Sequence, residues 1–197
     1  LEPEAASLVA FQTVQDEGEI DRQHQSFIVI DAGARTVDVT AFVVDHDGVL
    51  KRVKTPTAKL MGSSEINEEF QSFLHIRLFR GIEGVLIDQM KICLEIFEKE
   101  KVSLTEKSTP FIIIELPAAY TEECYIPLIS KNINKFNMRN ETRLSLLVGD
   151  RVELNIPHKD FVKLFIEPVV NRNMIEIRRI IENLVEEEPS LKRILFV

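Results

Sequence analysis

The 197-residue sequence has a net charge of −8, with 45% hydrophobic and 28% charged residues. This balance is typical of a globular chain rather than a disordered one, and the length suits one substantial domain or two small lobes. The acidic charge argues against nucleic-acid and anionic-membrane partners, and no signal peptide or membrane-length apolar run is visible. We therefore expect a cytoplasmic protein.

The first quarter of the chain predicts a helix followed by a β-meander. Pro3 and the acids beside it favour a short helix, and the polar residues 16–25 predict a loop. Residues 27–31 and 36–44 are rich in β-forming side chains, and the second run alternates in the manner of a strand. The dipeptide Asp47-Gly48 predicts a hairpin turn that leads to a third strand over residues 49–55.

The remainder alternates helical and strand patterns. Apolar residues at helical spacing predict helices over 63–79 and 83–101, and an apolar strand is predicted over 111–116. A capped helix over 121–134 and a hairpin of 143–148 with 151–156 follow. We then expect a long helix over 159–187, kinked at Pro168, and a buried strand over 193–197.

The turn between the first two strands carries the most informative chemistry. Asp31 and Asp38 flank it, Gly33 lies within it, and the hydroxyl of Thr36 stands at its end. Backbone N–H groups in tight turns form anion-binding concavities, and two carboxylates can hold Mg²⁺ through its hydration shell. The alternative interpretation is an ordinary hairpin with a polar turn, since single glycine-turn motifs occur often by accident.

Residues 31–40 resemble the motif D-x-G-G-G-T-x-D-x-T of the heat shock 70 kDa protein family and its actin-like ATPase relatives. The resemblance implies that Asp31 and Asp38 hold the water shell of Mg²⁺ and that Thr36 binds phosphate. It assigns Gly33, Ala34 and Arg35 to the nucleotide-binding loop.

The resemblance extends along the chain and is strongest to the divergent twelve-A and twelve-B branch of the family. Residues 1–7 are similar to that branch's L-E-P-E-A-A segment, which places Glu2 near the γ-phosphate and the attacking water. Residues 60–64 are similar to the family's L-G-G-E-D-F region, and this adds Gly62 to the nucleotide-binding residues. Residues 98–101 are similar to an E-x-x-K-R helix segment, which assigns Glu98 to the ribose and Lys101 to the base.

Three departures weaken the resemblance at the nucleotide. Ala34 and Arg35 replace two glycines of the phosphate loop, and Val102 replaces the arginine that stacks on the base. A Cβ in a left-handed turn conformation costs about 1–2 kcal/mol, so either the loop differs from the family's or it is strained. We expect Arg35 to point toward the phosphate position and to pair with Asp31 or Asp38 when nucleotide is absent.

These observations predict an α/β fold of the actin and heat-shock-chaperone (ribonuclease H-like) ATPase class. The resemblance implies that the chain is a fragment, the second lobe, with a base subdomain of residues 1–56 and 159–197, a mixed sheet with helices, and an upper subdomain of residues 57–158. The implied function is binding and hydrolysis of ATP·Mg²⁺ between two lobes of a parent protein, with ATP or ADP and Mg²⁺ as cofactors. Phosphoryl transfer to water relies on positioning and charge stabilisation.

Two alternatives stay open. A degenerate, non-hydrolysing nucleotide sensor or interaction scaffold of the same fold is favoured by Arg35 and Val102. A sugar or acetate kinase of the same superfold is disfavoured by the segments at residues 1–7 and 98–101.

Partners follow from the same interpretation. They are nucleotide, the first lobe, and client or co-chaperone proteins, with no nucleic acid and no membrane. We expect this chain alone to be inactive as an ATPase and to self-associate through an apolar interlobe surface.

The cysteines and histidines show no pattern of a metal or catalytic site. Cys93 and Cys124 lack C-x-x-C spacing, which favours buried or free thiols over a disulfide or a metal site. The four histidines are scattered without ligand spacing.

Overall fold

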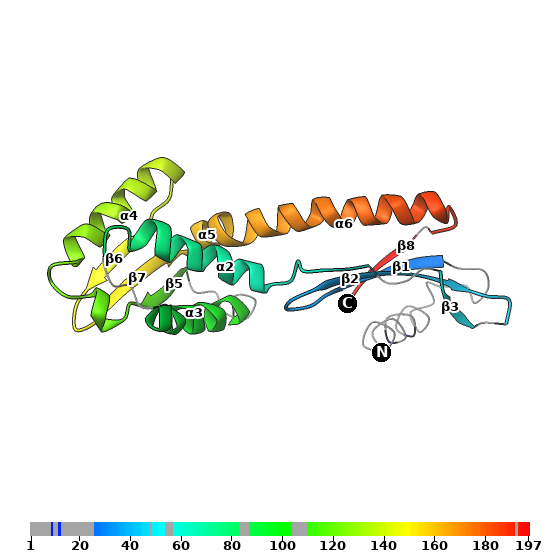
Figure 1. Ribbon diagram of the computed structural model, residues 1–197, viewed down its shortest axis with the longest axis horizontal. Coiled ribbons are helices and arrows are strands. Elements are labelled where there is room, and N and C mark those ends of the chain that lie inside the picture. The colour runs from blue at the N-terminus through cyan, green and yellow to red at the C-terminus, as the bar shows by residue number, and fades with distance from the viewer. Residues whose placement is uncertain are drawn as a thin grey trace. The chain divides into compact units, whose positions relative to one another are not determined.

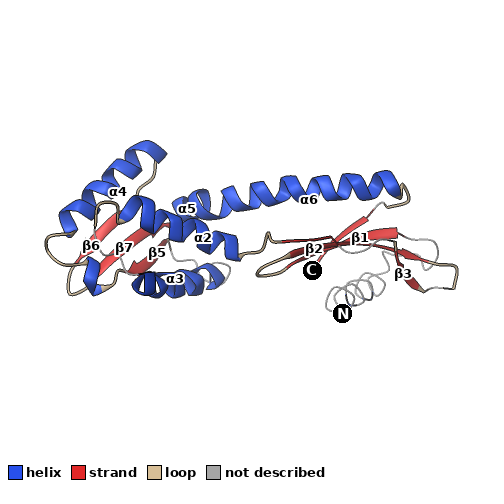
Figure 2. Ribbon diagram, viewed as in Figure 1, coloured by secondary structure: helices blue, strands red, loops and turns tan. Residues whose placement is uncertain are grey.

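The computed structural model describes residues 9, 12, 26–47, 49–53, 57–82, 87–103, 110–191 and 193–197. The chain forms two units, Leu1–Glu65 with Val170–Val197 and Ile66–Val169. Each unit combines a β-sheet with helices, so the predicted α/β class is confirmed (Figures 1 and 2). The expected helix at residues 2–7, together with Glu2, lies outside the described residues.

The first unit contains a mixed sheet. Strands β1 (Ser26–Ala32), β2 (Val37–Val44) and β3 (Leu50–Arg52) pair antiparallel, as the meander predicted. Strand β8 (Arg193–Phe196) joins β1 in parallel, and β4 (Thr57–Lys59) pairs with the beginning of β2. The order is β3-β2-β1-β8, so β8 lies at the edge of the sheet that the described residues form.

Both faces of this sheet carry buried apolar side chains because β1 and β2 alternate with a period of two. Helix α6 (Glu167–Glu187) packs its Ile177, Ile180 and Leu184 onto the face that contains Ile28 and Ile30 (Figure 1). The opposite face forms a second cluster of Phe27, Val29, Phe42 and Val44, with Leu50 and Leu195 packed against it. The alternation of side chains along β1 and β2 places Asp31 and Asp38 on this second face as well.

The prediction that the last strand is buried is wrong. In β8 the side chains of Ile194 and Phe196 are 45% and 65% exposed. The strand pairs with β1 on one side only within the described residues, so it lacks the neighbours that bury a central strand.

The second unit is a three-stranded antiparallel sheet covered by helices. Its order is β5 (Phe111–Glu115), β7 (Val152–Pro157) and β6 (Ser145–Val148), which confirms the predicted hairpin across Gly149. Helix α3 (Ile87–Val102) lies against β5, and helix α4 (Ile126–Asn140) lies against β6 (Figure 1). Helix α2 (Ser64–Phe73) continues into a π-helical turn at Leu74–Leu78.

Phenylalanine rings form the centre of the second unit's core. Phe70 stacks on Phe97 with ring centroids 4.0 Å apart, and Phe165 meets both rings edge-on. Aromatic pairs in such geometries add to the free energy of burial itself. The core therefore joins α2 and α3 to the helical segment that follows β7.

Two helix boundaries differ from the prediction. Helix α4 begins at Ile126 rather than Thr121, because Pro127 suits its first turn and Thr121 instead ends a 3₁₀ turn at Ala118–Tyr120. Just before Pro168, where we predicted a kink, a π-helical turn at Val162–Ile166 lies between α5 (His158–Phe161) and α6. Pro168 has no N–H to donate to the preceding turn, so the regular ladder is interrupted there.

Candidate functional site

Asp31 and Asp38 are directly opposite each other in the antiparallel pair of β1 and β2. Directly opposed residues project from the same face of a sheet, so both carboxylates lie side by side at the turn end of the hairpin. Both residues are half-buried, and neither pairs with a cationic side chain within the described part of the chain. Like charges in this arrangement repel each other, and a bound cation would remove that penalty.

The turn between them offers backbone donors. Gly33 N–H donates to the Thr36 carbonyl at 2.9 Å, and this bond closes the turn. The N–H groups of Ala34, Arg35 and Thr36 donate to no backbone acceptor among the described residues. Successive free N–H groups in a turn form the kind of concavity that binds anions.

Of the two alternatives for this turn, a changed loop or a strained one, the left-handed strain is absent. None of residues 33–36 has a positive φ, so Ala34 and Arg35 carry their Cβ atoms without the left-handed penalty. The expected ion pair is also absent, because Arg35 is exposed and pairs with neither Asp31 nor Asp38. An exposed guanidinium keeps its hydration and rotamer freedom, and a surface ion pair seldom outweighs both.

The segment that leads into α2 is hydrogen-bonded to the backbone of this turn. The N–H groups of Gly62, Ser63 and Ser64 donate to the carbonyls of Arg35, Gly33 and Ala34 at 3.1, 3.4 and 2.8 Å respectively. These bonds occupy donors at the beginning of α2. The backbone N–H groups that lack a backbone acceptor in this region are therefore those of the turn rather than those of residues 62–64.

Gly62 is at this position because nothing larger fits. A Cβ there would lie 2.3 Å from the Ala34 carbonyl carbon and oxygen and 2.4 Å from the Arg35 nitrogen. The sequence pointed to Gly62 as a nucleotide-binding residue, and the structure places it against the backbone of the turn itself.

Helix α6 fixes the same segment from its other side. The Asn173 side-chain amide donates to the Met61 carbonyl at 2.7 Å, and Arg172 pairs with Glu65 at 3.1 Å. Sequence reasoning missed these contacts, because no local pattern links residues 61–65 to residues 172 and 173.

Thr36 is coupled to Asp38. Its hydroxyl donates to the Asp38 carboxylate at 3.1 Å, and this orients both side chains beside the turn. The Thr36 oxygen retains its acceptor capacity.

Glu98 and Lys101 are brought together in the second unit. The Lys101 ammonium lies 2.7 Å from the Glu98 carboxylate, and Asn67 of α2 contacts both, donating to Glu98 and accepting from Lys101 at 2.9 Å. Burial raises the pKa of Glu98, but hydrogen bonds from Lys101 and Asn67 outweigh burial and hold it below the ordinary 4.5. The sequence did not predict that Asn67 contacts both Glu98 and Lys101.

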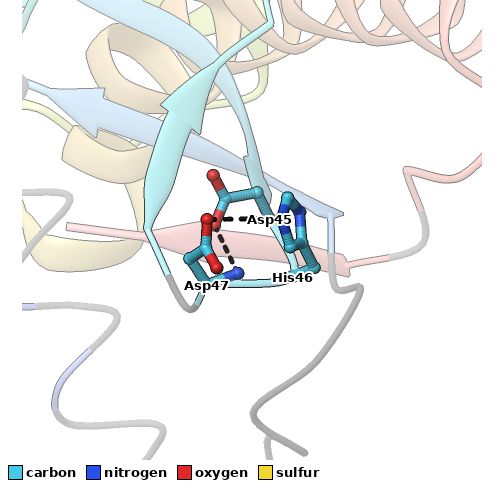
Figure 3. A group of neighbouring side chains, drawn as sticks. All are labelled: Asp45, His46 and Asp47. Carbon is cyan, nitrogen blue, oxygen red and sulfur yellow. Dashed lines mark hydrogen bonds and ion pairs between the residues drawn. The ribbon is translucent and has the colours of Figure 1, made fainter.

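A third acidic group lies at the turn between β2 and β3. Figure 3 shows Asp45, His46 and Asp47 as neighbours, and one possible metal-ligand atom from each lies within 4.8 Å of the other two. One Asp45 oxygen accepts the N–H groups of Asp47 and Val49, and the other pairs with Lys51 at 2.8 Å. The Lys51 bond above all lowers the Asp45 pKa to about 2. These contacts are those of a hairpin turn capped by a side chain, because the Asp45 carboxylate bonds to groups of the same hairpin.

The remaining sequence-based expectations have simple outcomes. Cys93 and Cys124 are both free, Cys93 buried and Cys124 exposed. The described residues contain no helix that is both long enough and apolar enough to cross a membrane. Neither the family models nor the curated proteins with which the sequence was compared gave a match.

Proposed function

We propose that the β1–β2 turn binds the phosphates of a nucleotide together with Mg²⁺, as the second lobe of an actin-like ATPase of the heat-shock-chaperone type does. The observation that carries this proposal is the direct opposition of Asp31 and Asp38 beside free turn N–H groups. Two opposed carboxylates repel each other in a plain hairpin, whereas a hydrated divalent cation can be held by both.

The residues present suit the ligands in different ways. Asp31 and Asp38 are oxygen ligands of the type that Mg²⁺ prefers, and a pair of carboxylates suffices for an ion that keeps several waters. The N–H groups of Ala34, Arg35 and Thr36 are the donors for phosphate oxygens, and the Arg35 guanidinium can add a charge-assisted bond. Bound Mg²⁺ would neutralise negative charge on the phosphates.

The nucleoside contacts assigned by the resemblance are a separate proposal for the second unit. Glu98 and Lys101 are pre-positioned by Asn67, which supports a role for this trio in recognising hydroxyl and ring-nitrogen groups. Val102, where the family has its stacking arginine, is 67% exposed and supplies no cationic surface for a base. This difference favours the alternative function, a nucleotide sensor or scaffold that binds without hydrolysis.

Calorimetric titration of the 197-residue chain with ATP·Mg²⁺ tests the phosphate site. We expect Asp31→Asn and Asp38→Asn each to weaken binding by about tenfold or more, since each removes a ligand charge beside the cation. Asp150→Asn is the matched control, because Asp150 is an exposed acid in another hairpin turn. Chelating the Mg²⁺ is expected to remove the difference between wild type and the two site variants.

Two results would contradict the proposal. One is binding that is equally strong in wild type, Asp31→Asn and Asp150→Asn, and the other is affinity that does not depend on Mg²⁺. Phosphate release measured on a protein that contains both lobes then separates hydrolysis from the sensor alternative, because the 197-residue chain alone is expected to be inactive in either case.

A further inference from the structure

A second site lies in the Ile66–Val169 unit, in a cavity of about 420 Å³ between the π-helical turn at Leu74–Leu78 and helix α4. Five cationic side chains line this cavity: Arg77, Arg80, Lys131, Lys135 and Arg139. Among the described residues, no carboxylate lines it. The chain as a whole has a net charge of −8, so this positive cluster is a local feature that the net charge does not reveal.

None of the five cations makes an ion pair with another described residue. Lys131, Lys135 and Arg139 follow one another at intervals of four on α4, so they share one face of the helix. Like charges at this spacing destabilise a helix. A bound anion would convert that repulsion into attraction.

The frame of the cavity is well fixed. The Asn132 side-chain amide donates to the carbonyls of Leu78 and Arg80 at 3.0 Å each, which joins α4 to the end of the π-helical turn. Gly81 follows with φ of 86°, a conformation that lets the chain leave the turn without a Cβ penalty. Ile129 and Ile133 anchor α4 in the core. The cations therefore project from backbone that is held in place.

We propose that this cavity binds a small, multiply phosphorylated anion. Guanidinium groups form paired hydrogen bonds with phosphate oxygens, and the cavity holds three of them. Each phosphate monoester carries a charge of about −1.5 to −2, so clustered phosphates match five cations within this small volume. An acidic peptide carries one charge per residue and needs a longer surface to present as many.

The volume also points to a small ligand. It falls in the range of about 300–1,000 Å³ that is typical of small-molecule sites. Phe136 and Leu128 add apolar surface to the lining, which suits a ring or a chain to which phosphates are attached. The anion can be a soluble phosphorylated compound or the headgroup of a phosphorylated lipid, since both present the same chemistry.

Titration with inorganic tripolyphosphate, in buffer without Mg²⁺, tests the site. We expect the double variant Lys135→Glu/Arg139→Glu to lose about tenfold or more in affinity, because two attractive charges become repulsive. The matched control is Arg178→Glu/Arg179→Glu on α6, which makes the same change in net charge at two exposed arginines. We expect the control to bind as the wild type does.

Location and folding are checked independently. In amide NMR spectra, tripolyphosphate is expected to shift the Gly81 N–H and the Asn132 side-chain amide. The unliganded double variant is expected to unfold at no lower temperature than wild type, because repulsion is removed. If the double variant does not fold, Lys135→Ala/Arg139→Ala replaces it. This second variant only removes positive charge, and we expect it also to bind tripolyphosphate more weakly than wild type.

Vesicle sedimentation separates the two sources of phosphate. Binding to phosphatidylcholine vesicles that contain phosphatidylinositol bisphosphate, reversed by tripolyphosphate, identifies a lipid headgroup. Binding of tripolyphosphate without vesicle binding identifies a soluble ligand.

Three results would overturn the inference. They are no tripolyphosphate binding by wild type, equal loss in the α6 control, and equally strong binding of an oligoglutamate peptide. This titration contains no Mg²⁺, and its NMR probes, Gly81 and Asn132, lie in the Ile66–Val169 unit, so failure here is distinct from failure of the proposed nucleotide site.

Discussion

Gly62 lies so close to Ala34 that a Cβ at Gly62 would come within 2.3 Å of the Ala34 carbonyl carbon and oxygen. The obstacle is backbone on both sides, so relief requires the turn between β1 and β2 to move. The three N–H···O bonds from residues 62–64 to the turn would be lost or lengthened with it.

The substitution Gly62→Ala is therefore expected to lower the free energy of unfolding by about 1–3 kcal/mol, the usual cost of overpacking. Thermal and urea unfolding measure the change. Gly149→Ala is the control, since a Cβ there meets its nearest neighbour, the Arg151 carbonyl oxygen, at 3.9 Å. Equal melting temperatures for the two variants would show that residues 62–64 and the turn can move apart without a loss of stability.

The pair of Glu98 and Lys101 predicts a pH dependence. The Glu98 pKa is lowered in the folded chain, because the bonds from Lys101 and Asn67 outweigh the effect of burial. A carboxyl group with a lowered folded pKa adds stability above its unfolded pKa, and that stability is lost as the pH falls through the folded value. The contribution is thus present at neutral pH and declines below about 4.5.

NMR titration of the Glu98 carboxyl measures this directly. In Lys101→Met we expect the Glu98 pKa to rise, because burial remains while the ammonium is gone. Lys99→Met is the control on the same helix, with an exposed side chain. A Glu98 pKa that responds equally to both variants would assign the shift to the general field of the helix rather than to the Lys101 contact.

The two thiols are expected to react at very different rates. Burial raises the pKa of Cys93 from 9.0 to about 12, whereas Cys124 is exposed. Thiolate is the reactive form, so alkylation at pH 8 is expected to label Cys124 quickly and Cys93 only after denaturation. Mass spectrometry of peptides from native and unfolded protein measures both. Rapid native labelling of Cys93 would mean that the α3–β5 region opens readily.

The hairpins were the most predictable part of the fold. Strand alternation and turn dipeptides are local signals, and they identified β1–β2, β2–β3 and β6–β7 correctly. The boundaries of α4 were not predictable, because Thr121 looks like a helix cap but closes a 3₁₀ turn. The exposure of β8 depends on its place at the sheet edge, and its apolar composition carries no information about that place.

The sequence by itself determined that Asp31 and Asp38 share one face beside a turn. Their positions in two antiparallel strands, with side chains that alternate at a period of two, require it. The residue pattern also located Glu98 and Lys101 within one turn of a helix, where neighbours at i and i+3 meet.

Only the tertiary structure decided which distant segments meet these residues. Gly62 lies against the Ala34 carbonyl, Asn67 bridges Glu98 and Lys101, and Arg77 and Arg80 line one cavity with the basic face of α4. Each contact joins residues that are far apart in the chain, and it exists because the apolar faces of the helices and strands pack in one arrangement. Neither the net charge of −8 nor the local spacing of apolar residues predicts that arrangement, because both are properties of the sequence alone and do not depend on how the core packs.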